Sequence, residues 1–195
     1  MARNSRSERP GSPRARLFLA LELPDGAREA LAAWRDDAIA GREDVRPVGA
    51  SALHVTLVFL GYRAEKEISR IAATAFEPLR SLAGSVLEPS DVVPVPKRDP
   101  RLFALDLADP EGDCAAVQLA ASDALASARF YKPEKRPFWP HVTLARVKRR
   151  VRRAPPIEAP PPDFGPFTAT VVTLYRSTLR REGALYEPLE RVTLG

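Results

Sequence analysis

Two kinds of hydrophobic pattern alternate along the chain. Short apolar runs such as RLFLALEL over residues 16–23 predict strands, whereas apolar residues spaced three and four apart, as in residues 65–82, predict helices. The expected order is strand 16–23, helix 27–38, strand 53–60, helix 65–82, strands 86–96 and 102–107, helix 113–128, and strands 141–147, 167–177 and 185–194. This order favours an α+β fold in which helices cover the outer faces of largely antiparallel sheets.

The chain has 195 residues, which is enough for one domain with a sizeable core or for two small lobes that share one. We therefore expect a single folding unit over residues 15–195. Residues 1–14 are rich in Arg and Ser and have no amphipathic apolar face, so we expect a disordered basic tail there. The apolar run 17–21 is too short to span a membrane or to form the core of a signal peptide.

Cys114 is the only cysteine, which excludes an intramolecular disulfide and a cysteine-based zinc site within the chain. A reducing, cytoplasmic location is expected. Positive charge is carried almost entirely by arginine: the net charge is +5 at pH 7, and only five of 30 basic residues are lysines. Guanidinium groups bind phosphate oxygens in pairs, which favours a polyanionic partner. A GC-rich genome also encodes many arginines, so charge alone leaves both explanations open.

The chain contains two histidines, and each opens the same tetrapeptide, His-Val-Thr-Leu, at residues 54–57 and 141–144. Val-Thr-Leu without histidine recurs at 172–174 and 192–194, so only the leading histidine is informative. Side chains alternate along a strand, which places each histidine and its threonine on one face while the valine and leucine anchor the other. A single histidine in a strand is commonly structural, but a matched pair favours a functional site.

Two imidazoles across a cleft can act as a general acid and a general base near neutral pH. The hydroxyls of Thr56 and Thr143 can bind the non-bridging oxygens of a phosphate, where negative charge grows in the transition state. The pattern therefore indicates a phosphodiester substrate. A zinc site is the alternative, but two histidines without a third ligand at a recognisable spacing argue against it. We expect no cofactor and no metal.

At these residues the chain resembles the two-histidine phosphoesterase superfamily, in particular its LigT-like RNA 2',3'-cyclic phosphodiesterases. The resemblance also covers four longer blocks in the family's order: RLFLALELP, LHVTLVFLG, RPFWPHVTLARV and LYRSTLRREGALYEPLERVTL. It implies a bilobal fold with pseudo-twofold symmetry, in which antiparallel sheets line a central cleft. It also implies hydrolysis of a terminal 2',3'-cyclic phosphate to a 2'-phosphate, together with reversible 2'-5' RNA ligation.

Roles follow from the same resemblance. His54 would donate a proton to the departing 3'-oxygen, His141 would accept one from the attacking water, and Thr56 and Thr143 would hold the phosphate. Arg146 would also contact the phosphate. Strict alternation would turn Arg146 to the core face, so a bulge or strand end must re-aim it; the alternative is a solvated charge at the strand end.

Two other functions remain compatible with the sequence. The first is a noncatalytic RNA-binding module with the same fold, for which the basic run 146–153 could guide an RNA backbone. The second is a phosphodiesterase for small cyclic nucleotides or for 2'-5' linked oligonucleotides. In each case we expect a monomer that does not associate with a membrane.

Overall fold

The computed structural model describes residues 13–152, 154–180 and 183–195. The strands are β1 (Arg14–Glu22), β2 (Val45–Pro47), β3 (His54–Ala64), β4 (Ser85–Val95), β5 (Leu102–Ala108), β6 (His141–Val147), β7 (Phe167–Ala169), β8 (Val171–Arg180) and β9 (Gly183–Thr193). The α-helices are α1 (Asp25–Ala38), α2 (Ile68–Phe76) and α3 (Asp113–Ser127), and the 3₁₀ turns are η1 (Ala50–Ala52), η2 (Glu65–Glu67) and η3 (Glu77–Leu79). In this part of the chain no helix is long and apolar enough to cross a membrane.

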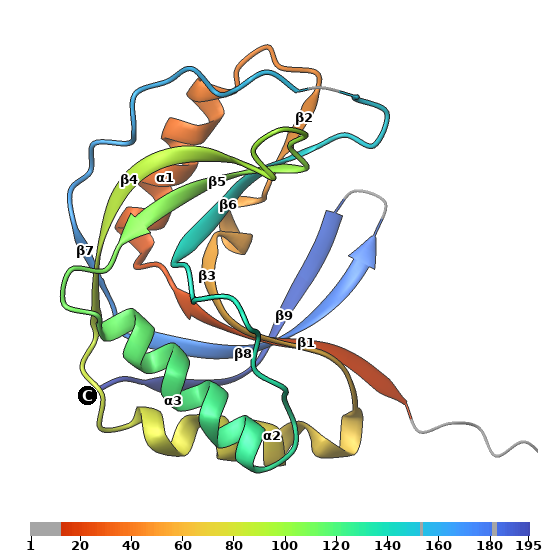
Figure 1. The fold of residues 1–195 in the computed structure, drawn as a ribbon, viewed down its shortest axis with the longest axis vertical. Coiled ribbons are helices and arrows are strands. Elements are labelled where there is room, and N and C mark those ends of the chain that lie inside the picture. The colour runs from red at the N-terminus through yellow and green to blue at the C-terminus, as the bar shows by residue number, and fades with distance from the viewer. Residues whose placement is uncertain (1–12, 153, 181–182) are drawn as a thin grey trace, which may run out of the picture.

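All strand pairs are antiparallel, and hydrogen bonds link eight strands in the order β7-β4-β5-β6-β3-β1-β8-β9, with β2 added on β6. The expected α+β class is confirmed. Figure 1 shows a strongly curled sheet, with α2 and α3 packed together below it and the β8–β9 hairpin projecting to one side.

At the centre of the sheet, one pair of residues joins the two halves of the sheet. β3 and β6 pair only through Val55 and Val142, the second residue of each His-Val-Thr-Leu segment. On one side of this contact β3 continues into β1, β8 and β9, and on the other side β6 continues into β5, β4 and β7. The two motifs therefore run antiparallel about a pseudo-twofold axis, and this arrangement agrees with the expected bilobal fold.

Each half contains a β-bulge at the leucine of its motif. In β3, Val58 pairs with Leu19 and Thr56 with Ala20, which leaves Leu57 as an extra residue. In β6, Ala145 and Thr143 pair with successive residues of β5, which leaves Leu144 as the extra residue. Both leucines are buried, so the bulges are held in place by the core.

The inner-facing leucines of β1 form the middle of the main core: Leu17, Leu19 and Leu21 are fully buried. They alternate with Phe18, Ala20 and Glu22, whose side chains lie on the opposite face of the strand. α1 adds Leu31 to the same core, and α3 adds Val117 and Leu125. Because one face of β1 is so completely apolar, its register against β3 is fixed, and with it the position of the first motif.

Several predicted boundaries differ from the observed ones. The helix predicted over 65–82 is divided into η2, α2 and η3. α2 ends before η3 because Pro78, near the start of η3, cannot donate the hydrogen bond that would continue α2. The strand predicted over 167–177 is interrupted at Thr170, and β2 was not predicted. Of the expected basic tail, residues 1–12 lie outside the described residues, and Arg14 already pairs in β1.

Candidate active site

His54 begins β3 and is held at both ring nitrogens. Its Nδ1 donates to the carbonyl oxygen of Ala52 at 2.8 Å, and its Nε2 lies 3.1 Å from the hydroxyl of Thr56. The ring packs on Phe18, with 5.0 Å between ring centroids, and meets Tyr186 edge-on at 5.3 Å. Since Nδ1 carries the proton given to Ala52, Nε2 is the nitrogen that can exchange a proton with a substrate.

His141 begins β6 and is fixed by the same local device. Its Nδ1 donates to the carbonyl oxygen of Trp139, again two residues earlier, at 2.8 Å. The Trp139 ring stacks on the imidazole with 4.0 Å between centroids and 16° between planes. The indole N–H then donates to Asp106 at 2.6 Å, which fixes the stack in one orientation. His141 therefore also presents Nε2.

A carboxylate stands opposite each histidine on the neighbouring strand: Glu22 pairs with His54, and Asp106 pairs with His141. Sequence reasoning missed both residues. A signal for them existed, because Ala-Leu-acid-Leu occurs at residues 20–23 and again at 104–107, as a second repeated block beside the histidine motif. The alanine of each block lies opposite the motif threonine, where its small side chain leaves room beside the hydroxyl.

Both carboxylates accept hydrogen bonds from neighbouring side chains. Glu22 accepts hydrogen bonds from the Thr173 hydroxyl, from Tyr175 at 2.9 Å and from Arg191 at 3.0 Å. Burial opposes ionisation of Glu22, but these three donors outweigh it and lower the pKa of the carboxyl group. Glu22 thus ties β1 to β8 and β9 as an ionised acceptor, while Asp106 holds Trp139.

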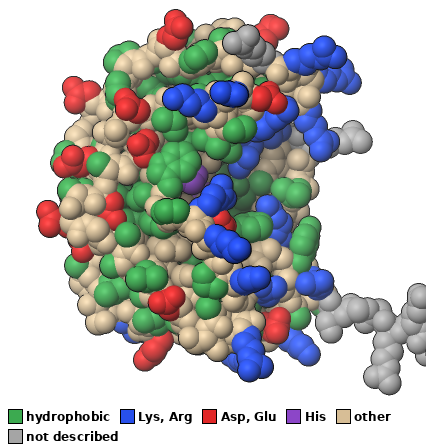
Figure 2. Space-filling view, in the orientation of Figure 1, with side chains coloured by type: hydrophobic (Ala, Val, Ile, Leu, Met, Phe, Trp, Pro, Cys, Tyr) green, Lys and Arg blue, Asp and Glu red, His purple; other side chains and the backbone are tan. Residues whose placement is uncertain are grey.

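Four of the five predicted site residues line one cavity of about 510 Å³: His54, Thr56, Thr143 and Arg146. His141 is not among the lining residues; it joins the site through the Val55–Val142 pairing and through the electrostatic effect of its charge on His54. In the space-filling view, blue Lys and Arg side chains gather along a hollow in which purple histidine surface is visible (Figure 2). Arg16, Arg46, Arg149 and Arg180 also line this cavity, and no acidic residue does among those described.

The bulge at Leu144 explains how Arg146 reaches the cavity. The extra residue makes Leu144 and Ala145 both point into the core, so that Arg146 returns to the face that carries His141 and Thr143. This is the re-aiming that the sequence required. The equivalent bulge at Leu57 does the same for Phe59, which lines the cavity and is 42% exposed. The guanidinium of Arg16 lies 4.5 Å from the centroid of the Phe59 ring.

The side chains that could ligate a metal ion are His, Cys, Asp and Glu. Among the described residues, no group of three or more His, Cys, Asp or Glu side chains is placed so that it could hold a metal ion. Cys114, the remaining candidate soft ligand, is buried in the main core, and burial raises the pKa of its thiol to about 12. The predicted site residues that line the cavity offer imidazole, hydroxyl and guanidinium groups.

Comparison with known proteins decides the family. A model of the 2'-5' RNA ligase superfamily matches residues 23–180. The chain belongs to the 2'-5' RNA ligase superfamily. Relatives in this superfamily include the RNA 2',3'-cyclic phosphodiesterase of Escherichia coli, 36% identical over 187 residues that cover 92% of this chain and 96% of the relative. The enzyme of the same name from Thermus thermophilus is 34% identical, covering 92% and 90% respectively.

Solved structures of superfamily members have the same fold. The crystal structure of E. coli LigT in apo form matches with a TM-score of 0.76 at 30% identity, covering 94% of this chain and 99% of LigT. LigT complexed with 3'-AMP matches with a TM-score of 0.75 at 29% identity, covering 93% and 99%. The family resemblance inferred from the two histidine motifs is thus confirmed.

Protonation of the histidines in this superfamily member is set by burial. The pKa of His54 is lowered from 6.5 to about 4, chiefly by burial; the hydrogen bond to Ala52 opposes this shift, and the charges of His141 and Arg146 add to it. Burial also lowers the pKa of His141, whereas the Trp139 carbonyl and the charge of Asp106 raise it. Both imidazoles are therefore mainly neutral at pH 7 in the free protein.

A pH-dependent stability follows for His54. Its pKa in the folded protein, about 4, lies below its ordinary value of 6.5, so between these values the unfolded chain binds more protons. We expect the folded state to lose stability as pH falls from 6.5 towards 4, and His54→Gln to lose less. Thermal melting across this range checks the prediction, with Arg80→Gln, an exposed position outside the cavity, as the control. Parallel curves for wild type and His54→Gln would contradict it.

Proposed function

We propose that this chain hydrolyses the 2',3'-cyclic phosphate at the end of an RNA to a 2'-phosphate. The observation that carries the proposal is the antiparallel pairing of two identical motifs, each of which leaves an imidazole Nε2 on the strand face that carries its threonine hydroxyl. The relatives in Escherichia coli and Thermus thermophilus are named RNA 2',3'-cyclic phosphodiesterases, which supports this substrate over other phosphodiesters.

In the proposed reaction His141 Nε2 accepts a proton from water as the water oxygen attacks phosphorus. The bond between phosphorus and the 3'-oxygen breaks, and His54 Nε2 donates its proton to that oxygen. The products are a 2'-phosphate monoester and a free 3'-hydroxyl, and the two histidines regain their starting states by proton exchange with solvent. Strain in the five-membered cyclic ester is released in the same step, so an acid and a base suffice.

The donor role of His54 requires that substrate binding change its protonation. Burial keeps this ring neutral in the free protein. A bound phosphate brings a negative charge beside Nε2, and an opposite charge at this distance favours the protonated imidazole. Binding of the substrate anion and uptake of a proton by His54 are therefore linked in the proposal.

Three side chains are suited to the non-bridging phosphate oxygens. Thr56 and Thr143 hold equivalent positions in the two motifs and both line the cavity, and the bulge brings Arg146 to the same wall. Hydroxyl and guanidinium donors that are already in place stabilise charge that develops on the equatorial oxygens during attack. We assign phosphate binding to these three residues.

RNA as the substrate is supported by Phe59. This exposed aromatic side chain stands on the cavity wall beside the first motif, with Arg16 over its ring. Single-stranded RNA is commonly bound by stacking of its bases on aromatic rings and guanidinium planes. If the 5'-hydroxyl of a second RNA attacks in place of water, the same bond to the 3'-oxygen breaks and a 2'-5' linkage forms.

The proposal is tested with an oligonucleotide that ends in a 2',3'-cyclic phosphate, incubated with the protein in EDTA. We expect conversion to the 2'-phosphate, identified by chromatography against 2'- and 3'-phosphate standards, at a rate that EDTA does not change. Retention of the cyclic end would support a noncatalytic RNA-binding protein instead. Activity that disappears with chelator and returns with zinc would contradict the two-histidine mechanism. Faster turnover of small cyclic nucleotides or 2'-5' oligonucleotides would change the substrate.

A further inference from the structure

The cavity extends beyond the groups that the proposed chemistry uses. An adjoining lobe of about 440 Å³ shares Arg46, Arg146 and Arg180 with the catalytic part but is lined by neither histidine and neither motif threonine. Its remaining walls come from the uncharged segment around η1 and from the start of β9. Because the two lobes share these walls, a ligand that fills the catalytic part can continue directly into the second lobe.

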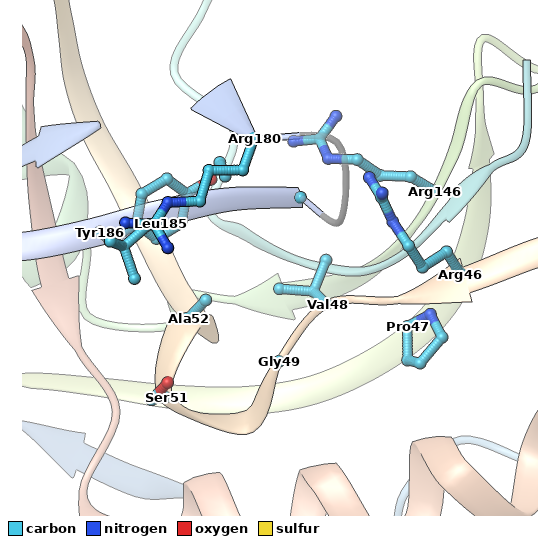
Figure 3. A pocket seen from close by; sticks show the side chains of 12 residues that line it. Arg46, Pro47, Val48, Gly49, Ser51, Ala52, Arg146, Arg180, Leu185 and Tyr186 are labelled. Carbon is cyan, nitrogen blue, oxygen red and sulfur yellow. The ribbon is translucent and has the colours of Figure 1, made fainter. Parts of the chain in front are cut away.

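Three arginines from three strands line the second lobe: Arg46 from β2, Arg146 from β6 and Arg180 from β8. Arg46 and Arg146 are direct cross-strand partners. Figure 3 shows both side chains extending from their strands towards the end of the β8–β9 hairpin, while Arg180 extends from the hairpin towards Leu185 and Tyr186. No acidic residue lines this lobe in the part of the chain that the structure describes. Guanidinium groups bind phosphate oxygens through paired, charge-assisted hydrogen bonds.

The bulge and β2 hold this arrangement together. The N–H of Val48 donates to the carbonyl of Leu144, the extra residue of the bulge, at 2.9 Å. The carbonyl of Val48 in turn accepts a hydrogen bond from the guanidinium of Arg35, a side chain that is 4% exposed. The wall that carries Arg46 is thus anchored to the bulge that places Arg146, so the guanidinium groups are positioned before a ligand arrives.

We propose that this lobe is a subsite for a second phosphate, the phosphodiester on the 5' side of the terminal nucleoside of the RNA. The inference rests on the proposed function, which places the cyclic phosphate among His54, Thr56, Thr143 and Arg146. The next charged group of an RNA strand is the phosphodiester one nucleotide away. In the adjoining lobe, Arg46 and Arg180 give that group its ligands, next to Arg146, which lines both lobes. The site therefore selects RNA ends over isolated nucleoside 2',3'-cyclic phosphates.

The test compares two substrates in the same protein: adenosine 2',3'-cyclic phosphate, which has one phosphate, and the dinucleotide ApA 2',3'-cyclic phosphate, which has two. We expect kcat/KM to be at least about tenfold higher for the dinucleotide, as expected for a hydrogen bond to a charged group. A dinucleotide with a neutral methylphosphonate linkage keeps both bases and should lose most of this preference. The loss assigns the preference to phosphate charge rather than to the added base.

Substitutions in the second lobe test whether its arginines cause the preference for the dinucleotide. Arg46→Gln and Arg180→Gln should each lower the ratio of kcat/KM for dinucleotide to mononucleotide by about fivefold to tenfold, again as one charged hydrogen bond requires. Neither should alter the ratio for the methylphosphonate dinucleotide. Arg80→Gln removes an exposed charge outside the cavity and should leave all ratios unchanged. Because each ratio is measured within one protein preparation, a loss of folded protein cancels.

The outcomes separate this inference from the function on which it rests. Hydrolysis of both substrates with equal kcat/KM, or a preference that Arg46→Gln and Arg180→Gln leave unchanged, would overturn the second phosphate subsite and keep the phosphodiesterase. A preference that survives the neutral linkage would assign selectivity to base stacking and also overturn the subsite. Failure to hydrolyse either substrate would overturn the proposed function itself.

Discussion

Replacement of His54 or His141 by alanine is expected to lower kcat for the cyclic RNA end by about 10² to 10⁴-fold, the range that one positioned acid or base contributes. Each variant removes one Nε2 that the structure orients through a backbone carbonyl. The double variant should be little worse than either single one, because acid and base act in the same step. Single-turnover rates on a labelled oligonucleotide measure these effects without interference from product release.

Measurement of RNA binding shows whether a histidine variant has lost a catalytic group or has lost its folded structure. Both alanine variants should bind an oligonucleotide with a 2'-phosphate end almost as tightly as the wild type, since the guanidinium groups remain; fluorescence anisotropy measures this. Thr193→Ala is the matched control, because Thr193 belongs to a Val-Thr-Leu segment that no histidine precedes, and it is exposed in β9. A histidine variant with wild-type kcat would contradict the acid and base assignment.

The second large effect is expected for Arg146. Arg146→Gln should lower kcat by about 10² to 10³-fold, as does removal of one donor to a developing oxyanion. Arg146→Lys keeps the charge but loses the paired donor geometry, and should restore only part of the rate. The comparison of kcat with KM locates the loss in the transition state, because a purely electrostatic attraction for RNA would change KM instead.

Arg149→Gln is the matched control for this prediction. Arg149 lines the same cavity and lies three residues further along the chain, beyond the end of β6. As an exposed charge it should change kcat by no more than about fivefold. Equal losses in the two variants would show that Arg146 acts only as part of a basic surface, and would contradict its assignment to the phosphate.

The sequence located most of the secondary structure because the hydrophobic patterns are strong where the core requires them. β6 was predicted with its observed bounds, and β1, β3 and α3 within a few residues, since their apolar faces pack into one continuous core. The prediction of secondary structure failed where the local hydrophobic pattern is weak. β2 has only three residues, and its pairing partner, β6, lies about a hundred residues away in the chain, so no local signal marks it.

The residues of the candidate site also fall into those that the local sequence pattern identified and those that it missed. His54, Thr56 and Thr143 were identified from the repeated motif and do line one cavity, because the period of a strand fixes which side chains share a face. Glu22 and Asp106 were missed although their Ala-Leu-acid-Leu blocks repeat, since an acidic residue acquires meaning only when the register places it opposite a histidine.

The sequence by itself determined the two histidine strands, the faces on which their side chains lie and the guanidinium character of the surface. Only the tertiary structure decided that Arg146 and Phe59 turn towards the cavity, because a bulge depends on the register between two strands and not on either strand alone. The same holds for Arg46 and Arg180, which β2 and the β8–β9 hairpin bring to Arg146 from distant parts of the chain. Pairing between distant segments is a property of the folded core, and no local pattern encodes it.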